Sequence, residues 1–322
     1  MAKIVVAGSI LLDKINQISS YPNAGELTQI HSIELACGGC VPNVAIDLKT
    51  IMPQTQVYAL GKVGDDQEKD FIFNAFKNKG VDFTGVVVDQ AEKTSFTEVM
   101  SVKGGQRTFF TYAGASAKFG YEDIDFDNLS ADMFHLGYFL LLDKVDNGDG
   151  EKILKKVKQL GIKTSIDLVS ENSDRYAKVL PCLKYTDNLI INEVEAGRLV
   201  GIEPTNQNLQ AIASSLKQMG VSERVIIHQP ENSVCLSNDG FTILPSYQLP
   251  DGFIKGTTGA GDAFCAGALL GISQGLSDIE VLKLANISAI NALSTQDAVS
   301  GLKPIDKMVE VCKNLTRKEL TI

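Results

Sequence analysis

Short runs of β-branched and apolar residues alternate with longer segments of helical periodicity along this chain, and this alternation constrains its fold most. The runs that predict strands are residues 4–7, 57–60, 86–88, 133–136, 164–168, 188–191 and 224–227. Helices are expected at 43–51, 68–79, 151–160 and 278–293, and a further one begins near Ala260. Strands separated by helices form βαβ units, so we predict an α/β fold with a mostly parallel central sheet flanked by helices.

Two stretches, 14–36 and 94–112, interrupt this rhythm. Each alternates apolar and polar residues around a turn, at 21–25 in the first stretch and at 103–106 in the second. Period-two alternation on both sides of a glycine-containing turn is typical of a β-hairpin. We therefore expect a small antiparallel sheet that projects from the body as a lid over a cleft. The prediction for residues 1–322 is one α/β domain with these two lid segments inserted.

The composition is that of an ordinary globular protein, with 44% hydrophobic and 21% charged residues. The net charge of −9 argues against a broad basic surface, so no nucleic-acid partner is expected. The first residues lack the apolar stretch of a signal peptide, and the longest apolar run, at 134–142, is far shorter than the roughly 18 residues that a membrane helix needs. We expect a cytoplasmic protein with no membrane partner.

Two of the six cysteines, Cys37 and Cys40, have the C-x-x-C spacing of redox and metal sites. Such a site needs a second pair of ligands or a thioredoxin-like context, and no cysteine pair or histidine lies nearby in the sequence. The sequence therefore favours a structural interpretation, in which Cys37 and Cys40 are small buried residues beside a glycine turn.

The segment 256–267 carries most of the chemistry. A glycine-rich turn leads into a helix near Ala260, and Gly259 and Gly261 allow a ligand to approach the backbone closely. The unpaired amides and the dipole of the helix start form an anion hole suited to phosphate. Asp262 follows directly, where a carboxylate can accept the proton of an attacking hydroxyl. The alternative is a glycine turn before a core helix, with Asp262 as a first-turn acid.

At this point the chain resembles the ribokinase-like (PfkB) carbohydrate kinases. The Gly-Ala-Gly-Asp of residues 259–262 is similar to the second signature of that family. Five other segments resemble family landmarks in the same order, namely residues 8–13, 37–43, 61–66, 105–110 and 192–196. The resemblance spans nearly the whole chain and implies ATP-dependent phosphorylation of a hydroxymethyl group on a sugar or sugar derivative.

The resemblance also implies roles for single residues. Asp262 would be the catalytic base, and Gly259, Ala260 and Gly261 would form the anion hole. The helix dipole is expected to keep Asp262 ionised. The sugar hydroxyls would bind Asp13, Gly39 and Asn43, although a turn residue for Asp13 and a helix cap for Asn43 are the alternatives from the sequence alone. Arg107 on the lid is a further substrate-binding candidate and hints at an acidic or phosphorylated substrate.

ATP and Mg²⁺ are the cofactors that the resemblance implies. Asn192 would lie near the nucleotide phosphates, and Glu195 would order a water bound to Mg²⁺, which retains much of its hydration shell. His228 is expected in the pocket wall. Asn286 would pack near the adenine, with a solvated helix face as the alternative.

The sequence departs from the family pattern at two places. Gly256 replaces an aspartate that commonly helps to hold a monovalent cation, so we do not expect potassium activation. Residues 228–233 replace a Thr-x-Gly-x-x-Gly motif, and Pro230 removes a backbone donor there, so nucleotide contacts should differ.

Other functions stay open. One alternative is a nucleoside kinase, and another is a catalytically weak, sugar-binding regulatory protein of the same fold. A hydride-transferring enzyme fits poorly because no G-x-G-x-x-G follows the first strand. The exposed strands of the lid make a homodimer through the lid plausible.

Overall fold

The computed structural model describes residues 2–102, 107–171, 173–295 and 297–320. The strands are β1 (Lys3–Gly8), β2 (Leu11–Ile18), β3 (Ile30–Gly38), β4 (Gln56–Gly64), β5 (Val86–Asp89), β6 (Ser95–Val102), β7 (Arg107–Tyr112), β8 (Met133–Phe139), β9 (Lys163–Leu168), β10 (Asn188–Asn192), β11 (Arg224–His228), β12 (Asn232–Ser237) and β13 (Gly240–Pro245). The α-helices are α1 (Cys40–Ile51), α2 (Gln67–Lys79), α3 (Gly150–Gln159), α4 (Leu180–Leu183), α5 (Glu193–Val200), α6 (Leu209–Gln218), α7 (Ala260–Ser273), α8 (Asp278–Ala292) and α9 (Ile305–Cys312).

Within the described residues, nine strands form the central sheet in the order β13-β12-β11-β10-β9-β8-β1-β4-β5. The seven strands from β11 to β5 pair in parallel, and β12 and β13 add an antiparallel edge. This confirms the predicted α/β class. Every strand and helix predicted from periodicity is present, with small shifts at the ends.

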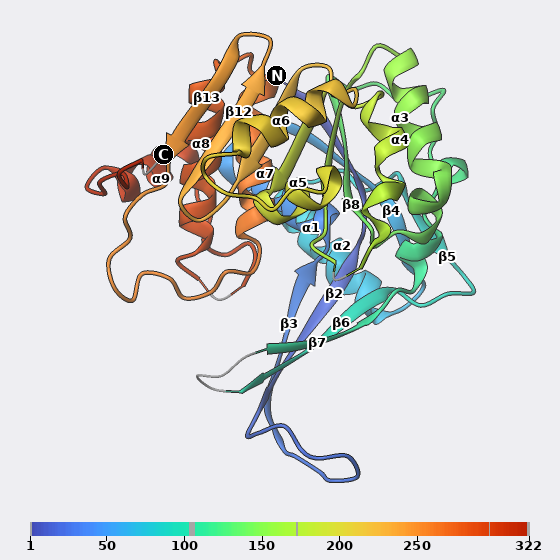
Figure 1. The fold of residues 1–322 in the computed structure, drawn as a ribbon. Coiled ribbons are helices and arrows are strands. Elements are labelled where there is room, and N and C mark those ends of the chain that lie inside the picture. The colour runs from blue at the N-terminus through green and yellow to red at the C-terminus, as the bar shows by residue number, and fades with distance from the viewer. Residues whose placement is uncertain (1, 103–106, 172, 296, 321–322) are drawn as a thin grey trace.

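Helices cover both faces of the sheet (Figure 1). One core lies between the sheet and α1, α2, α7, α8 and α9, and the other lies between the sheet and α3, α4, α5 and α6. Strand β1 supplies both cores in alternation, with Ile4 and Val6 in the first and Val5 and Ala7 in the second. A strand buried on both faces must be apolar at every position, which explains the continuous run in the sequence.

The second sheet has the order β3-β2-β6-β7 and projects from the body (Figure 1). Both hairpins, β2–β3 and β6–β7, are antiparallel as predicted, and they join through a parallel pairing of β2 with β6. The lid strands extend slightly beyond the expected segments, so Asp13 lies within β2 and not in a turn after the first strand. The predicted turn Lys103-Gly104-Gly105-Gln106 lies outside the described residues.

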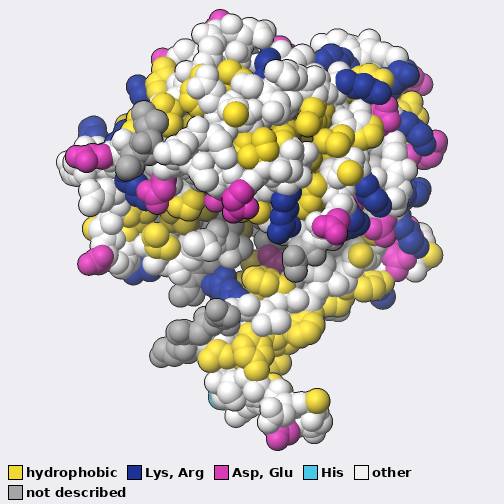
Figure 2. All heavy atoms as spheres, in the orientation of Figure 1, with side chains coloured by type: hydrophobic (Ala, Val, Ile, Leu, Met, Phe, Trp, Pro, Cys, Tyr) yellow, Lys and Arg dark blue, Asp and Glu magenta, His cyan; other side chains and the backbone are white. Residues whose placement is uncertain are grey.

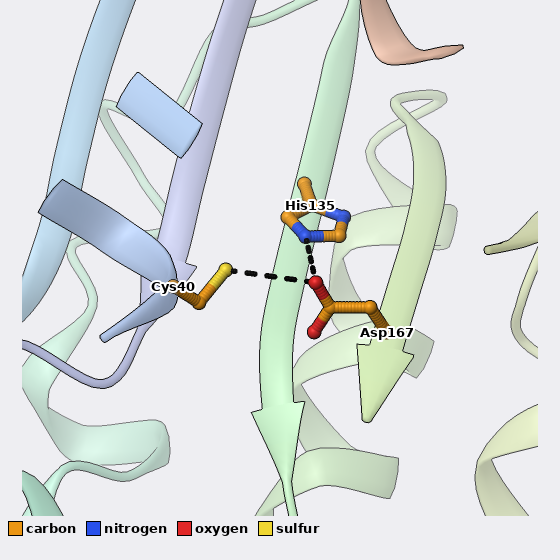
Figure 3. Close-up of side chains that lie close together, drawn as sticks. All are labelled: Cys40, His135 and Asp167. Atoms are coloured by element: carbon orange, nitrogen blue, oxygen red, sulfur yellow. Dashed lines mark hydrogen bonds and ion pairs between the residues drawn. The ribbon is translucent and has the colours of Figure 1, made fainter. Parts of the chain in front are cut away.

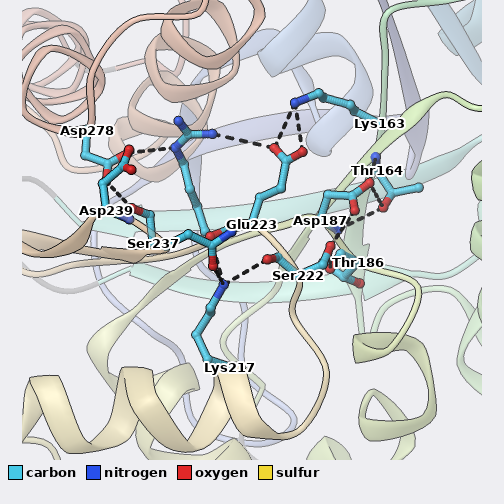
Figure 4. A network of polar contacts seen from close by, with 12 residues as sticks. Lys163, Thr164, Thr186, Asp187, Lys217, Ser222, Glu223, Ser237, Asp239 and Asp278 are labelled. Carbon is cyan, nitrogen blue, oxygen red and sulfur yellow. Dashed lines mark hydrogen bonds and ion pairs between the residues drawn. The ribbon is translucent and has the colours of Figure 1, made fainter.

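A polar network ties together the amino ends of the parallel strands (Figure 4). Asp187 accepts hydrogen bonds from the backbone of Thr164 at 2.9 Å and from Lys158 Nζ at 2.7 Å. Lys163 forms an ion pair with Glu223 at 2.8 Å. Ligand sites in such sheets form at the carboxyl ends of the strands. This network lies at the opposite ends, so we assign it a structural role.

Among the described residues, none of the helices has both the length and the apolar character needed to cross a bilayer.

Candidate functional site

The start of α7 forms one wall of a cavity at the carboxyl ends of the strands. Gly259 precedes the helix with a φ of 78°, and a Cβ atom there would lie 2.5 Å from the backbone of Ala298, so only glycine fits. At Gly261 a Cβ would meet only His228, at 3.8 Å, which leaves the helix end open. The cavity has a volume of about 170 Å³ and is lined by Gly259, Gly261 and Asp262. First-turn amides have no earlier helical carbonyl to bind, so this end can receive an anion.

Asp262 is buried, and two side chains hold its carboxylate. Oδ2 accepts hydrogen bonds from Asn43 Nδ2 and from the Tyr138 hydroxyl, both at 2.9 Å. Burial, reinforced by the negative charge of Asp167, raises the pKa of Asp262 to about 7 against the opposing effect of these two hydrogen bonds. The expectation that the helix dipole keeps this group ionised did not take its burial into account, which favours the neutral form. A carboxylate with this pKa is suited to exchange a proton near neutral pH.

Tyr138 was not found from the sequence. It is the last residue but one of β8 and has a φ of 61°, which is rare for a residue with a side chain. Its backbone N–H donates to Asp167 Oδ1 at 2.6 Å. In this backbone conformation, the hydroxyl of Tyr138 donates its hydrogen bond to Asp262. Only coordinates reveal such a φ angle, since the sequence around Tyr138 reads as an ordinary apolar strand.

Asn43 faces the site from α1 and is not a helix cap. The cap position belongs to Gly39, whose φ is 85° and where a Cβ would lie 2.7 Å from the backbone oxygen of Ser9. Ser9 accepts hydrogen bonds from the first amides of α1, a role that the sequence did not suggest. The Oδ1 atom of Asn43 is buried without a protein partner in the structure. A buried polar atom without a partner is costly, so this oxygen is available to a donor such as a hydroxyl.

A small cleft between the lid and the body brings together Asp13, Arg107 and Thr258. Arg107 Nη1 donates to Thr258 Oγ1 at 2.9 Å, which joins β7 of the lid to the loop before α7. Burial raises the pKa of Asp13 to about 7. The close approach of Asp13 also explains a glycine, since a Cβ at Gly38 would lie 2.6 Å from its carboxylate.

A larger cavity of about 690 Å³ opens on the other side of the α7 start. His228, Gly261 and Asn286 all line it, together with apolar residues of α8 and of the segment after β13. Burial lowers the pKa of His228 to about 4, so its ring is neutral at neutral pH and lies 4.6 Å from the ring of Phe264. Asn286 is buried and donates to Ser233 Oγ at 2.6 Å, which rules out the alternative of a solvated helix face.

Asn192 and Glu195 lie where β10 passes into α5. They form a capping box, in which each side chain accepts a hydrogen bond from the backbone of the other residue. Glu195 also accepts from Ser170 Oγ at 2.7 Å, and burial raises its pKa to about 8 despite these hydrogen bonds. Both residues line the cavity that contains Asp262. The structure thus brings the predicted anion-hole, base and phosphate-side residues to one place, with the predicted lid residues on the adjoining cleft.

Comparisons with known proteins identify the family of this chain. The family model for pfkB family carbohydrate kinases matches residues 1–304. A ribokinase of Arabidopsis thaliana is 26% identical over 317 residues, covering 96% of this chain and 81% of the relative. An adenosine kinase of Saccharomyces cerevisiae is 27% identical over 283 residues, covering 84% of this chain and 82% of the relative.

The fold also matches solved structures. The Arabidopsis thaliana ribokinase structure with ribose and ATP has a TM-score of 0.83 and 23% identity, covering 97% of this chain and 99% of that one. Because the family model covers nearly the whole length, the chain belongs to the pfkB family of carbohydrate kinases.

Proposed function

We propose that this protein transfers the γ-phosphoryl group of ATP to a hydroxymethyl group of a sugar or sugar derivative. The observation that carries the proposal is the position of Asp262. Its carboxylate is buried beside the start of α7 and accepts hydrogen bonds from Asn43 and Tyr138. A base next to an anion hole is what phosphoryl transfer to an alcohol requires.

The acceptor is proposed to bind on the lid side. Asp13 lines the cleft there and can bind a hydroxyl group, and the buried Oδ1 of Asn43 can accept one more hydrogen bond. The backbone at Gly39, which precedes α1, is proposed to contribute a further contact. Asp262 then takes the proton of the attacking hydroxyl. The amides at Gly259 and Gly261 are proposed to stabilise the negative charge on the migrating group, whereas the N–H of Ala260 already donates to the carbonyl of Thr257 at 3.3 Å. The lid excludes water, which limits hydrolysis of ATP.

The larger cavity is proposed to hold the nucleotide base, with Asn286 and His228 in its wall. Its mainly apolar lining suits a purine ring. Pro230 also lines this cavity, so the nucleotide contacts there differ from those expected of a glycine-rich motif. Two ribokinases of similar fold have been solved with a nucleotide, the Arabidopsis thaliana enzyme with ATP and the Cryptococcus neoformans enzyme with ADP.

The residues present fit Mg²⁺, which would neutralise charge on the phosphates. Asn192 and Glu195 offer amide and carboxylate oxygens on the cavity wall, the kind of donor that Mg²⁺ prefers. Both carboxylate oxygens of Glu195 already accept hydrogen bonds from the protein, so we propose that Glu195 acts through a water molecule.

Gly256 offers no carboxylate, and we propose that the reaction needs no potassium ion.

We also propose a homodimer through the lid. The projecting sheet carries exposed apolar side chains, among them Ile33, Phe109 and Phe110 (Figure 2). Soluble monomers seldom expose so many large apolar groups on one small element. We propose that the lid of a second subunit packs against these side chains.

Phosphorylation of a nucleoside is the second candidate, which the similarity to an adenosine kinase favours. ATP consumption should be measured over a panel of pentoses, hexoses, sugar acids, sugar phosphates and nucleosides, with Asp262→Asn as the control. Turnover with a sugar that the control abolishes supports the proposal, and turnover with nucleosides alone favours the second candidate. Tight sugar binding without turnover of any compound would indicate the regulatory alternative.

A further inference from the structure

A cysteine, a histidine and an aspartate converge beneath the proposed active site (Figure 3). Cys40 begins α1, His135 lies on β8, and Asp167 lies on β9. All three are buried, and one ligand atom from each lies within 4.8 Å of the others. Residues 95 and 32 positions apart thus meet at one point, which corrects the sequence-based view that Cys40 has no histidine nearby.

Two separations between the ligand atoms are close to those of a tetrahedral metal centre. His135 Nε2 lies 3.3 Å from Asp167 Oδ2, and Cys40 Sγ lies 3.9 Å from the same oxygen. Zinc bond lengths of about 2.0–2.1 Å to nitrogen and oxygen and about 2.3 Å to sulfur, at tetrahedral angles, place such atoms about 3.3–3.6 Å apart. An ion therefore fits among these atoms after shifts of a few tenths of an ångström.

The candidate for a fourth donor contacts one member of this group and lies outside the set of mutually close ligand atoms. Cys265, on α7, places its sulfur 3.6 Å from His135 Nε2. Cys265 and Asp167 both line the cavity of about 170 Å³ that contains Asp262, so an ion has a route to the ligands. Two sulfurs, one imidazole and one carboxylate are a donor set typical of zinc and unsuited to Mg²⁺, which takes oxygen ligands.

Further contacts orient the side chains of His135 and Asp167. Ser165 Oγ lies 3.2 Å from His135 Nδ1, and the backbone N–H of Tyr138 donates to Asp167 Oδ1 at 2.6 Å. Outer contacts of this kind orient the ligands in metal sites, because they fix the ring and leave the second nitrogen or oxygen directed at the ion.

We propose that Cys40, His135 and Asp167, with Cys265 as the fourth donor, bind one transition-metal ion of the zinc class. The site is distinct from the proposed Mg²⁺ position at Asn192 and Glu195 and does not depend on catalysis. Tyr138 links the two regions, since its N–H contacts Asp167 and its hydroxyl contacts Asp262.

The full-length protein, reduced, treated with chelator and desalted, should be titrated with Zn²⁺ and with Co²⁺ as a spectroscopic probe. We expect one equivalent of tightly bound metal. With Co²⁺ we expect the strong visible bands of tetrahedral coordination and a thiolate-to-metal charge-transfer band, which a surface site of oxygen ligands would not give. If the unmodified protein shows no charge-transfer band with Co²⁺, or binds less than one equivalent of metal, the proposal is overturned.

Two variants identify the ligands. Cys40→Ala should weaken Zn²⁺ binding by at least about tenfold, as should His135→Ala. The matched control is Cys182→Ala, which removes another buried cysteine that lies on α4 outside the cluster, and its affinity should equal that of the unmodified protein. Circular dichroism checks that each variant folds. Unchanged affinity in a folded Cys40→Ala variant contradicts the assignment.

Discussion

At the scale of single residues, burial decides the chemistry of the proposed base. Asp262 lies in a helix first turn, where the dipole favours the charged form, yet its pKa is raised to about 7. Desolvation therefore dominates, and the hydrogen bonds from Asn43 and Tyr138 limit the shift. These neighbours thus set the proton affinity of the group as well as its orientation.

Asp262→Asn should lower kcat by about 10²–10⁴, the usual contribution of a positioned acid or base. The amide keeps the size of the side chain and loses only its ability to take a proton at neutral pH. ATP affinity, measured by isothermal titration calorimetry, should stay within a few-fold because the anion hole is backbone. A variant with unchanged kcat would exclude Asp262 as the base.

The pH profile gives an independent test. A base with a pKa of about 7 is protonated in acid, so log(kcat/KM) should rise with pH and level off above about pH 7. Tyr138→Phe removes a hydrogen bond that favours the ionised carboxylate, so its profile should move to higher pH. A Tyr138→Phe profile that stays in place or moves to lower pH would show that this hydroxyl does not act on Asp262.

The sequence predicted residues whose motifs are contiguous and missed those that only the fold brings together. Gly259, Ala260, Gly261 and Asp262 are adjacent in the chain, so their position at one helix start is readable from the sequence, and the role proposed for them came from the family resemblance. Tyr138 reaches Asp262 across 124 positions. The partners of Cys40 are still less visible, because neither periodicity nor spacing relates residues on three different elements.

At the scale of elements, close packing of α7 on α8 holds the start of α7 in place. Gly267 permits this approach, because a Cβ there would lie 2.7 Å from Ser288 Oγ and 2.8 Å from the Cα of Ala285. The boundaries of α7 and α8 could be predicted closely because apolar periodicity marks them. The need for a glycine at position 267 could not be predicted, because it arises from the contact between the two helices.

Gly267→Ala should destabilise the protein by about 1–3 kcal/mol, the usual effect of overpacking a core. The control is Gly261→Ala on the same helix, where the nearest neighbour of the new methyl lies at 3.8 Å and folding should be preserved. Chemical unfolding followed by circular dichroism measures both. Equal stabilities for the two variants would mean that α7 and α8 adjust to a larger side chain without cost.

At the scale of the whole molecule, the lid connects assembly with substrate binding. Its inner side contributes Asp13 and Arg107 to the cleft, and Arg107 contacts Thr258 next to the start of α7. Its other side exposes Ile33, which is 64% exposed, and Phe110, which is 59% exposed. The alternation of each hairpin was readable from the sequence, but the parallel pairing of β2 with β6 and the resulting apolar surface follow only from the arrangement in space.

If the lid carries the dimer contact, one charge placed on it should separate the subunits. Ile33→Lys should reduce the mass measured by analytical ultracentrifugation from that of a dimer to that of a monomer, because burying an unpaired ammonium in an apolar contact is costly. Leu160→Lys is the matched control, since it makes the same change at an exposed apolar residue on the body and should leave the mass unchanged. A monomeric unmodified protein, or a dimer that survives Ile33→Lys, would contradict assembly through the lid. Because the lid also lines the cleft, separation should raise the KM for the acceptor more than that for ATP.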